Sequence, residues 1–144
     1  IVEIVQAPKT LSEGQSLDIE SHGDHGVRFD ANVDLTGGPF CDIRFLGPAG
    51  RRAQPTTYES SFLLDQQRVR SVGFCQVARQ NFRAKARIPA GWHQNICDPN
   101  MPTDHAEWNR HAGLTDFAPT DFLDFIRKSA DLWSIDLGEE KELL

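Results

Sequence analysis

The sequence predicts one α+β domain in which an antiparallel β-sheet meander is covered by a C-terminal amphipathic helix. Apolar and polar residues alternate over 27–35, and similar stretches separated by turn residues continue to residue 88. An apolar stripe with helical spacing follows over 119–132. The length of 144 residues and the 39% of hydrophobic residues fit a single domain 1–144. We divide it into N-terminal strands at 1–88, a loop and short helix at 89–113, and a closing helix at 119–132.

The clearest strand is predicted from Val27 to Leu35, because every second residue there is apolar. The turn-forming stretch at 36–39 precedes a second alternation at Cys41, Ile43 and Phe45, so we expect a hairpin. Further strands are expected at 58–64, 69–78 and 82–88, with weaker candidates at 1–6 and 16–20.

The predicted strand at 82–88 carries cations on one face. Arg83, Lys85 and Arg87 alternate with apolar residues, which places them about 7 Å apart in a row. Such a row either protects an edge strand from unwanted pairing or faces the phosphates of a ligand. The sequence supports both interpretations.

The segment after residue 88 is interrupted by prolines. Pro89, Pro99 and Pro102 predict a long loop that continues to Thr103. Thr103 is a suitable cap for a short helix over 104–112, which Gly113 would end. Loops longer than about 12–15 residues are uncommon in compact domains unless they bind or catalyse something. We therefore expect a functional role for this segment.

The closing helix is predicted from Pro119 to Leu132. Proline suits a first helical turn, and Asp121 and Asp124 lie near the positive end of the helix dipole. Its apolar stripe is expected to cover the sheet. A short strand at 133–137 and a frayed tail at 138–144 complete the expected order. The stripe consists of Phe122, Phe125, Ile126, Ala130 and Trp133.

The formal net charge of -6 is unevenly distributed along the chain. Residues 1–50 hold three basic and eight acidic side chains, residues 51–89 hold eight and two, and residues 90–144 hold four and eleven. The acidic total argues against a general nucleic-acid coat protein. The basic middle segment can still attract a phosphate-bearing ligand or an acidic protein, unless the acidic flanks neutralise it.

The cysteines Cys41, Cys75 and Cys97 are widely spaced and include no Cys-x-x-Cys pair, so they predict neither a disulfide framework nor a thiolate zinc site. A reducing, cytoplasmic environment is therefore expected. No apolar stretch approaches the roughly 18–20 residues that cross a bilayer, and the start at Ile1 lacks a signal-peptide pattern. We expect a soluble protein without a membrane partner.

Three of the five histidines, His93, His105 and His111, lie within 19 residues of one another. Because imidazole titrates near neutral pH, two such rings can act as general base and general acid without a metal ion. A neighbouring guanidinium can hold a phosphate, and a tryptophan can stack on a base. We therefore assign catalysis to the three histidines. Substrate binding is assigned to Arg83, Lys85, Arg87, Trp92, Asn109 and Arg110.

A zinc site is the competing use of these histidines. On a helix, the six-residue step from His105 to His111 is a rotation of about 240°, so the two side chains would not share a face. His22 and His25 would complete a site only if the fold brought their loop to one of these residues. We therefore expect no metal and no other cofactor.

The order of these elements resembles a family of small toxins from bacterial and archaeal toxin-antitoxin pairs, proposed to act as endoribonucleases. The resemblance covers about residues 29–132. It is carried by Arg87, by the Trp92-His93-Gln94-Asn95 stretch and by Asn109-Arg110-His111. It implies RNA cleavage and a tight antitoxin partner.

The favoured hypothesis is metal-independent RNA cleavage. In it, one of His105 and His111 deprotonates the ribose 2′-hydroxyl, the other protonates the leaving oxygen, and Arg87 or Arg110 holds the phosphate. The rival hypothesis is a non-catalytic interaction or ligand-binding module, such as a lectin-like sandwich, an antitoxin-like partner or a complex subunit. Catalysis requires two imidazoles within reach of one phosphate, whereas a binding module does not. RNA and an acidic protein are the expected partners.

Overall fold

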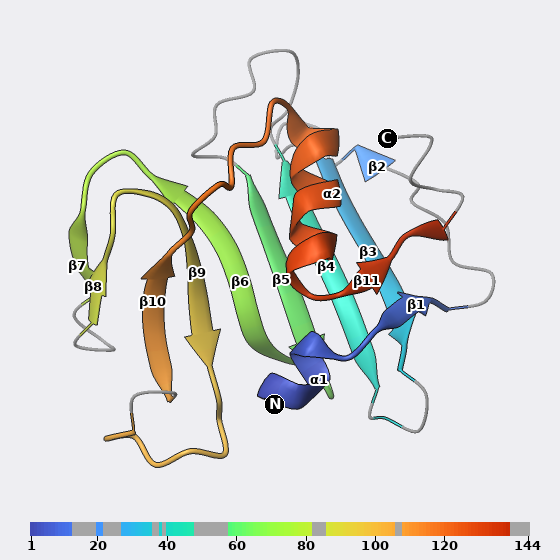
Figure 1. The fold of residues 1–144 in the computed structure, drawn as a ribbon, viewed down its shortest axis with the longest axis horizontal. Helices are drawn as coiled ribbons and strands as arrows, with labels where there is room; N and C mark the ends of the chain where they lie inside the picture. Colours follow the sequence, from blue (N-terminus) through green and yellow to red (C-terminus); the bar gives the residue numbers. More distant parts are fainter. Residues whose placement is uncertain are drawn as a thin grey trace.

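The computed structural model describes residues 1–12, 20–21, 27–35, 38, 40–47, 58–81, 86–105 and 108–138. Within them, nine strands form one large sheet and two more form a small sheet. Helix α2 (Phe122–Leu132) lies across one face of the large sheet (Figure 1). The strand order is β10-β9-β6-β5-β4-β3-β1-β11, with β2 paired to β3. The predicted α+β fold, a mostly antiparallel sheet with a C-terminal helix, is confirmed.

The meander is built from four strands that follow one another in the chain. They are β3 (Val27–Asp34), β4 (Cys41–Gly47), β5 (Glu59–Leu64) and β6 (Gln67–Cys75). Each pairs antiparallel with the next, as the alternating sequence predicts. Asp65 and Gln66 connect β5 to β6 with positive φ angles of 48° and 67°, the geometry that matches a two-residue turn to the strand twist.

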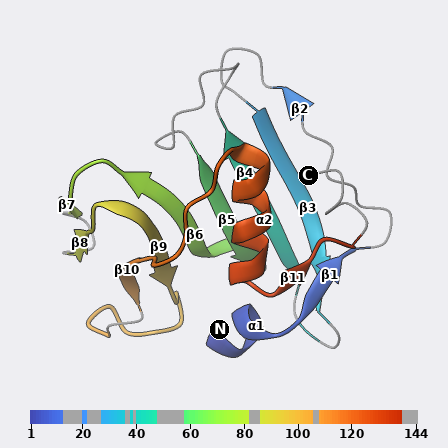
Figure 2. The same ribbon diagram turned by 45° about the horizontal axis from the view of Figure 1, so that its top comes forward.

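The prediction of a loop and short helix over 89–113 is wrong. Residues 91–97 form β9 (Gly91–Cys97), which pairs antiparallel with β6, and residues 109–113 form β10 (Asn109–Gly113), which pairs with β9. Pro89, Pro99 and Pro102 lie outside both strands, where the chain does not need their missing N–H groups. The hairpin extends the sheet beyond β6 (Figures 1 and 2).

The N-terminal residues form a helix, although the sequence predicted a strand at 1–6. Helix α1 (Val2–Gln6) places Ile1, Ile4 and Val5 toward the core. Ile4 and Val5 lie three and four positions after Ile1, which is the spacing of one face of a helix. The next strand, β1 (Lys9–Leu11), was not predicted. It pairs antiparallel with β3 and parallel with β11 (Ile135–Asp136), which lies within the predicted strand at 133–137.

Several weaker predictions concern residues at the margins of the described part. Strand β2 (Glu20–Ser21) touches the candidate at 16–20, most of which lies outside the described residues. The small sheet contains β7 (Arg79–Asn81) and β8 (Ala86–Ile88). Of the predicted cation row, Arg83 and Lys85 lie outside the described residues, and only the backbone of Arg87 is placed, opposite Gln80. The tail at 139–144 also lies outside the described residues.

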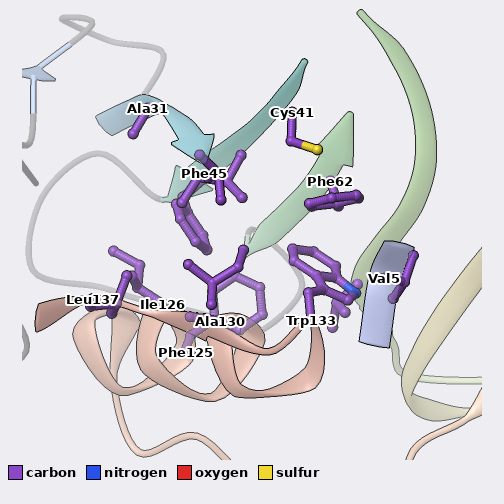
Figure 3. Close-up of a cluster of buried hydrophobic side chains, with 14 of the residues drawn as sticks. Val5, Ala31, Cys41, Phe45, Phe62, Phe125, Ile126, Ala130, Trp133 and Leu137 are labelled. Atoms are coloured by element: carbon purple, nitrogen blue, oxygen red, sulfur yellow. The ribbon is translucent and has the colours of Figure 1, made fainter. Parts of the chain in front are cut away.

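Helix α2 begins three residues after the predicted start because Asp121 caps it. The Asp121 carboxylate accepts a hydrogen bond of 2.7 Å from the Asp124 backbone N–H. The helix buries one face against the sheet, where Phe125 and Ala130 lie close to Phe45 of β4 (Figure 3). The other buried helix residues are Ile126 and Ser129.

Trp133, directly after α2, is fully buried and joins the helix to β9. Its ring packs against Phe62 with centroids 5.9 Å apart, and its Nε1–H donates a 2.9 Å hydrogen bond to Gln94 Oε1. A buried indole N–H requires such an acceptor. The prediction that this tryptophan belongs to the core is confirmed.

Lys9 ties the ends of the chain to the core. Its side chain is only 2% exposed, and its Nζ atom donates hydrogen bonds to the backbone carbonyls of Val5 at 2.8 Å, Ala7 at 2.5 Å and Trp133 at 2.6 Å. One ammonium group therefore satisfies carbonyls at the C-terminal ends of both helices. Burial lowers the pKa of Lys9 from 10.5 to about 8, although the neighbouring Cys41 opposes this shift.

We expect Lys9→Met to lower the free energy of unfolding by about 2–4 kcal/mol, because three carbonyls, two of them in buried hydrogen bonds, lose their donor. We also expect a pH dependence. The folded state releases the Lys9 proton near pH 8 and the unfolded state near pH 10.5, so between these values the unfolded state binds more protons and Lys9 adds stability as the pH rises. Across this range the gain is about 3 kcal/mol.

Urea unfolding of both proteins at pH 7, 8, 9 and 10 measures this effect. Comparing them at each pH cancels the opposing titration of Tyr58, whose pKa burial raises. Both proteins carry Cys41→Ala, because the charge of Lys9 itself lowers the pKa of that buried thiol. The difference between the two proteins should widen above pH 8. A difference that stays constant from pH 7 to 10 would contradict the assignment.

Candidate functional site

The face of the large sheet opposite α2 carries a row of polar residues, and we call it the outer face. Ser60 of β5 faces the helix, because its hydroxyl lies 2.9 Å from the Ser129 hydroxyl of α2. Successive strand residues point to opposite sides, so Glu59, Ser61 and Leu63 face outward. The pairing register then aligns six outward residues, one from each neighbouring strand. They are Asp30, Arg44, Ser61, Ser71, Asn95 and His111.

Two of the predicted histidines meet on this face. His93 of β9 pairs with Gly113 of β10, and His111 of β10 pairs with Asn95 of β9, so the two rings are diagonal neighbours. Their centroids are 5.7 Å apart and their planes are inclined by 60°. His93 is 8% exposed and His111 is half-buried.

The two histidine rings differ in their surroundings. Nδ1 of His93 lies 3.5 Å from the carbonyl oxygen of Gly91. A carbonyl only accepts hydrogen bonds, so this contact favours the tautomer with the proton on Nδ1 and a lone pair on Nε2. Gly73 of β6 lies opposite His93, and a Cβ atom there would be 3.7 Å from the His93 Nε2. The absence of a side chain at Gly73 leaves room beside the acceptor nitrogen.

The histidine pair lines a cavity of about 230 Å³, which we call the histidine cavity. Its polar lining includes Ser71, Asn95, Glu59 and Arg68, and Gly73 contributes to its wall. The buried Asn95 Oδ1 has no hydrogen-bond partner within the described part of the chain. The same is true of Oδ1 of Asn109, which lies on the same face at the end of β10. These atoms add acceptor groups near the imidazoles.

Arg68 forms an ion pair with Glu59 at the histidine cavity, with 3.2 Å between Nη2 and Oε1. Arg68 pairs in register with Leu63, four residues after Glu59 on β5. Its side chain must therefore extend along β5 past Ser61, which is 2% exposed. Because Ser60 pairs with Val72, the Glu59 end of this ion pair lies next to Gly73, the partner of His93.

A second hollow lies on the outer face of β3, β4 and β5. It measures about 560 Å³ and contains the Arg44–Asp30 ion pair, which is 2.9 Å long. Burial, and then the charge of Asp30, raise the pKa of Asp42 in its wall.

In the described part of the chain, no group of three or more His, Cys, Asp or Glu side chains is arranged to hold a metal ion. Nor is any described helix long and apolar enough to span a membrane.

The structure separates His105, Arg110 and Trp92 from the histidine pair. His105 is exposed in the connection beyond the Cys97 end of β9, whereas His93 pairs with Gly113 at the opposite end of the hairpin. Arg110 pairs with Ile96 and points to the side of α2 rather than outward.

Trp92 also lies on the side of α2 and belongs to the aromatic core, not to a base-stacking surface. Its ring stacks on Phe125 with centroids 5.4 Å apart, and it packs edge-on against Phe74 and Phe117.

Cys97 faces outward next to Asn109. Burial and the neighbouring Asp98 raise the pKa of the Cys97 thiol, which disfavours the reactive thiolate.

Sequence reasoning missed Arg68, Glu59, Ser71 and Gly73. The register shift between Phe62 and Leu63 breaks the alternation of β5 against β6, so the direction of Arg68 does not follow from a simple pattern. The available signal was the pair of small residues, Ser71 and Gly73, two positions apart on one face of the predicted strand.

No protein-family model, curated protein or solved structure matches this chain. The geometry of the outer face is therefore the main evidence on function.

We expect Gly73→Ala to leave the fold intact, because its added methyl group meets His93 only at ordinary contact distance. The free energy of unfolding should stay equal or rise by about 0.5 kcal/mol. In Gly47→Ala the new methyl group would lie 2.6 Å from the Phe122 ring, so that variant should lose about 1–3 kcal/mol. Urea unfolding distinguishes the two.

The same variants test the position of the His93 ring. The His93 Cε1–H resonance should shift in Gly73→Ala and stay in place in Gly113→Ala, where the nearest atom to the added methyl belongs to Pro89. Equal shifts in the two variants, or a Gly73→Ala protein as unstable as Gly47→Ala, would contradict the described cavity wall.

Proposed function

We propose that this protein cleaves RNA by metal-independent general acid–base catalysis, with His93 and His111 as the catalytic pair. The observation that carries the proposal is the meeting of these two rings, 5.7 Å apart, in one polar cavity that Arg68 also lines. The sequence hypothesis named His105 as one member of the pair, and the proposal replaces it with His93. The resemblance to endoribonuclease toxins adds support for RNA as the substrate.

The two rings suit different roles. The tautomer favoured at His93 presents a lone pair on Nε2, so His93 acts as the base that removes the proton of the ribose 2′-hydroxyl. The 2′-oxygen attacks the adjacent phosphorus, and the bond from phosphorus to the 5′-oxygen breaks. His111, in its protonated form, gives its proton to that leaving oxygen. The products are a 2′,3′-cyclic phosphate and a 5′-hydroxyl.

Electrostatics favours one proton on the pair rather than two. Two imidazolium charges at this separation repel, so protonation of one ring disfavours protonation of the other. A singly protonated pair contains one base and one acid, which is the state that the reaction requires. The guanidinium of Arg68 would stabilise the charge that develops on the phosphate oxygens.

A second candidate is a non-catalytic module that binds a polar ligand. It is favoured by the two hollows of about 560 and 230 Å³ along one row of hydrogen-bonding side chains. An extended ligand can span them through hydrogen bonds with no chemical step. The two functions differ in their need for the histidines, because binding can persist when both imidazoles are removed.

The test uses a 5′-labelled single-stranded RNA incubated with the protein in EDTA. His93→Gln and His111→Gln should each lower the cleavage rate by at least about 100-fold, because each loses a proton-transfer group. His105→Gln is the matched control and should cleave like the wild type. Gly73→Ala should also lower the rate, since its methyl group occupies the space beside Nε2 of His93 that the substrate hydroxyl needs, whereas Gly113→Ala should not.

Product analysis by mass spectrometry should find the 2′,3′-cyclic phosphate. Cleavage that persists in the His93→Gln/His111→Gln double variant would overturn the catalytic assignment. A wild-type protein that binds this RNA without cleaving it, and a double variant that binds equally well, would instead establish the binding module. Thermal unfolding of each variant checks that the fold is retained.

A further inference from the structure

We propose that Glu59 is a built-in competitor for the phosphate site of the histidine cavity, and that a substrate phosphate displaces it from Arg68. This inference rests on the proposed function, because it assumes that the ligand of the cavity carries a phosphate. It assigns Arg68 as the phosphate-binding cation and Glu59 as the group that regulates access to it.

The ion pair is placed for such an exchange. The Arg68 side chain extends along β5, so that its head group meets Glu59 beside Gly73 and His93. The guanidinium therefore already lies at the cavity, with one carboxylate occupying part of its donor surface. Arg68 has five N–H donors in a planar fork, which suits two oxygens of one phosphate.

Breaking the ion pair between Arg68 and Glu59 costs little free energy. The side chains of Arg68 and Glu59 are 51% and 40% exposed, and ion pairs in such surroundings contribute little to stability. The phosphodiester of RNA offers the same single charge and two free oxygens as the carboxylate, so it can replace Glu59 on the guanidinium fork without loss of hydrogen bonds. Displaced Glu59 can turn to solvent, whereas in the unliganded protein it holds the Arg68 side chain extended and ready to bind.

The chain offers a matched control on the same face. Arg44 and Asp30 form a second arginine–carboxylate pair of similar exposure, 37% and 46%, but they line the larger hollow on β3 and β4. Neutralising Asp30 alters the net charge by the same amount as neutralising Glu59. A general electrostatic effect would therefore change both variants equally, whereas a direct competition changes only the Glu59 variant.

The experiment measures binding of inorganic phosphate to the full chain by isothermal titration calorimetry at low ionic strength. Glu59→Gln should bind phosphate about three- to tenfold more tightly than the wild type, because the competing carboxylate is lost. Asp30→Asn should bind within about twofold of the wild type, and Arg68→Met should bind at least tenfold more weakly. Added salt should weaken binding in the wild type and in Glu59→Gln.

The RNA cleavage assay keeps this inference separate from the proposed function. Tighter phosphate binding in Glu59→Gln together with no cleavage by the wild type would retain the exchange and reject the nuclease. Cleavage by the wild type with equal phosphate affinity in Glu59→Gln and wild type would retain the nuclease and overturn the exchange. An equal gain in Glu59→Gln and Asp30→Asn would also overturn it, since that result reflects net charge alone.

Discussion

The pairing register of β9 between β6 and β10 is the constraint on which the candidate site depends. Side chains alternate along a strand, so a slip of one residue would turn His93 and Asn95 toward α2 and bring Trp92 to the outer face. The opposite side of β9 prevents this slip. Trp92 packs among the aromatic rings of the core, and Gln94 accepts the hydrogen bond of the buried Trp133. The residues that fix the register are therefore distinct from the residues that line the histidine cavity, although they belong to the same strand.

Lys9 connects this arrangement to the chain ends. Val5 in α1, Ala7 directly after it and Trp133 directly after α2 all present carbonyls to one ammonium group, which lies over the Phe62 ring at 5.4 Å. Figures 1 and 2 both show α1 and β1 beside this end of the helix. A charged group in such a position is costly to bury, and the lowered pKa of Lys9 expresses that cost. The hydrogen bonds to the three carbonyls offset this cost. One of these carbonyls belongs to Trp133, so Lys9 also fixes the backbone of the residue whose ring donates a hydrogen bond to Gln94 of β9.

The helices and strands with a regular apolar pattern could be predicted from the sequence. Strands β3 to β6 and helix α2 follow from alternation and from an apolar helical stripe, and Asp121 as the cap explains why the helix begins later than predicted. The β9–β10 hairpin was missed because its connection contains prolines and because the polar Gln94 interrupts the apolar side of β9. The histidine cluster was recognised from its density. The choice of His93 rather than His105 as the neighbour of His111 depends on a diagonal contact between strands, which spacing along the chain does not reveal.

The proposed site combines rigidly held imidazoles, which suit proton transfer, with a flexible arginine side chain, which suits phosphate binding. Proton transfer requires the imidazoles to keep a fixed geometry, and both are held on paired strands, one of them almost entirely buried. Phosphate capture tolerates movement, and the group assigned to it sits at the end of a long, half-exposed arginine side chain. A bulge in β6, where Val69 is the extra residue between Arg68 and Arg70, allows this cooperation, because it turns Arg68 outward beside β5. In a regular β6, Arg68 would pair with Leu64 and point to the side of α2, away from Glu59. The irregularity in the sheet is therefore what brings a cation from the basic middle segment to imidazoles that come from the acidic C-terminal segment.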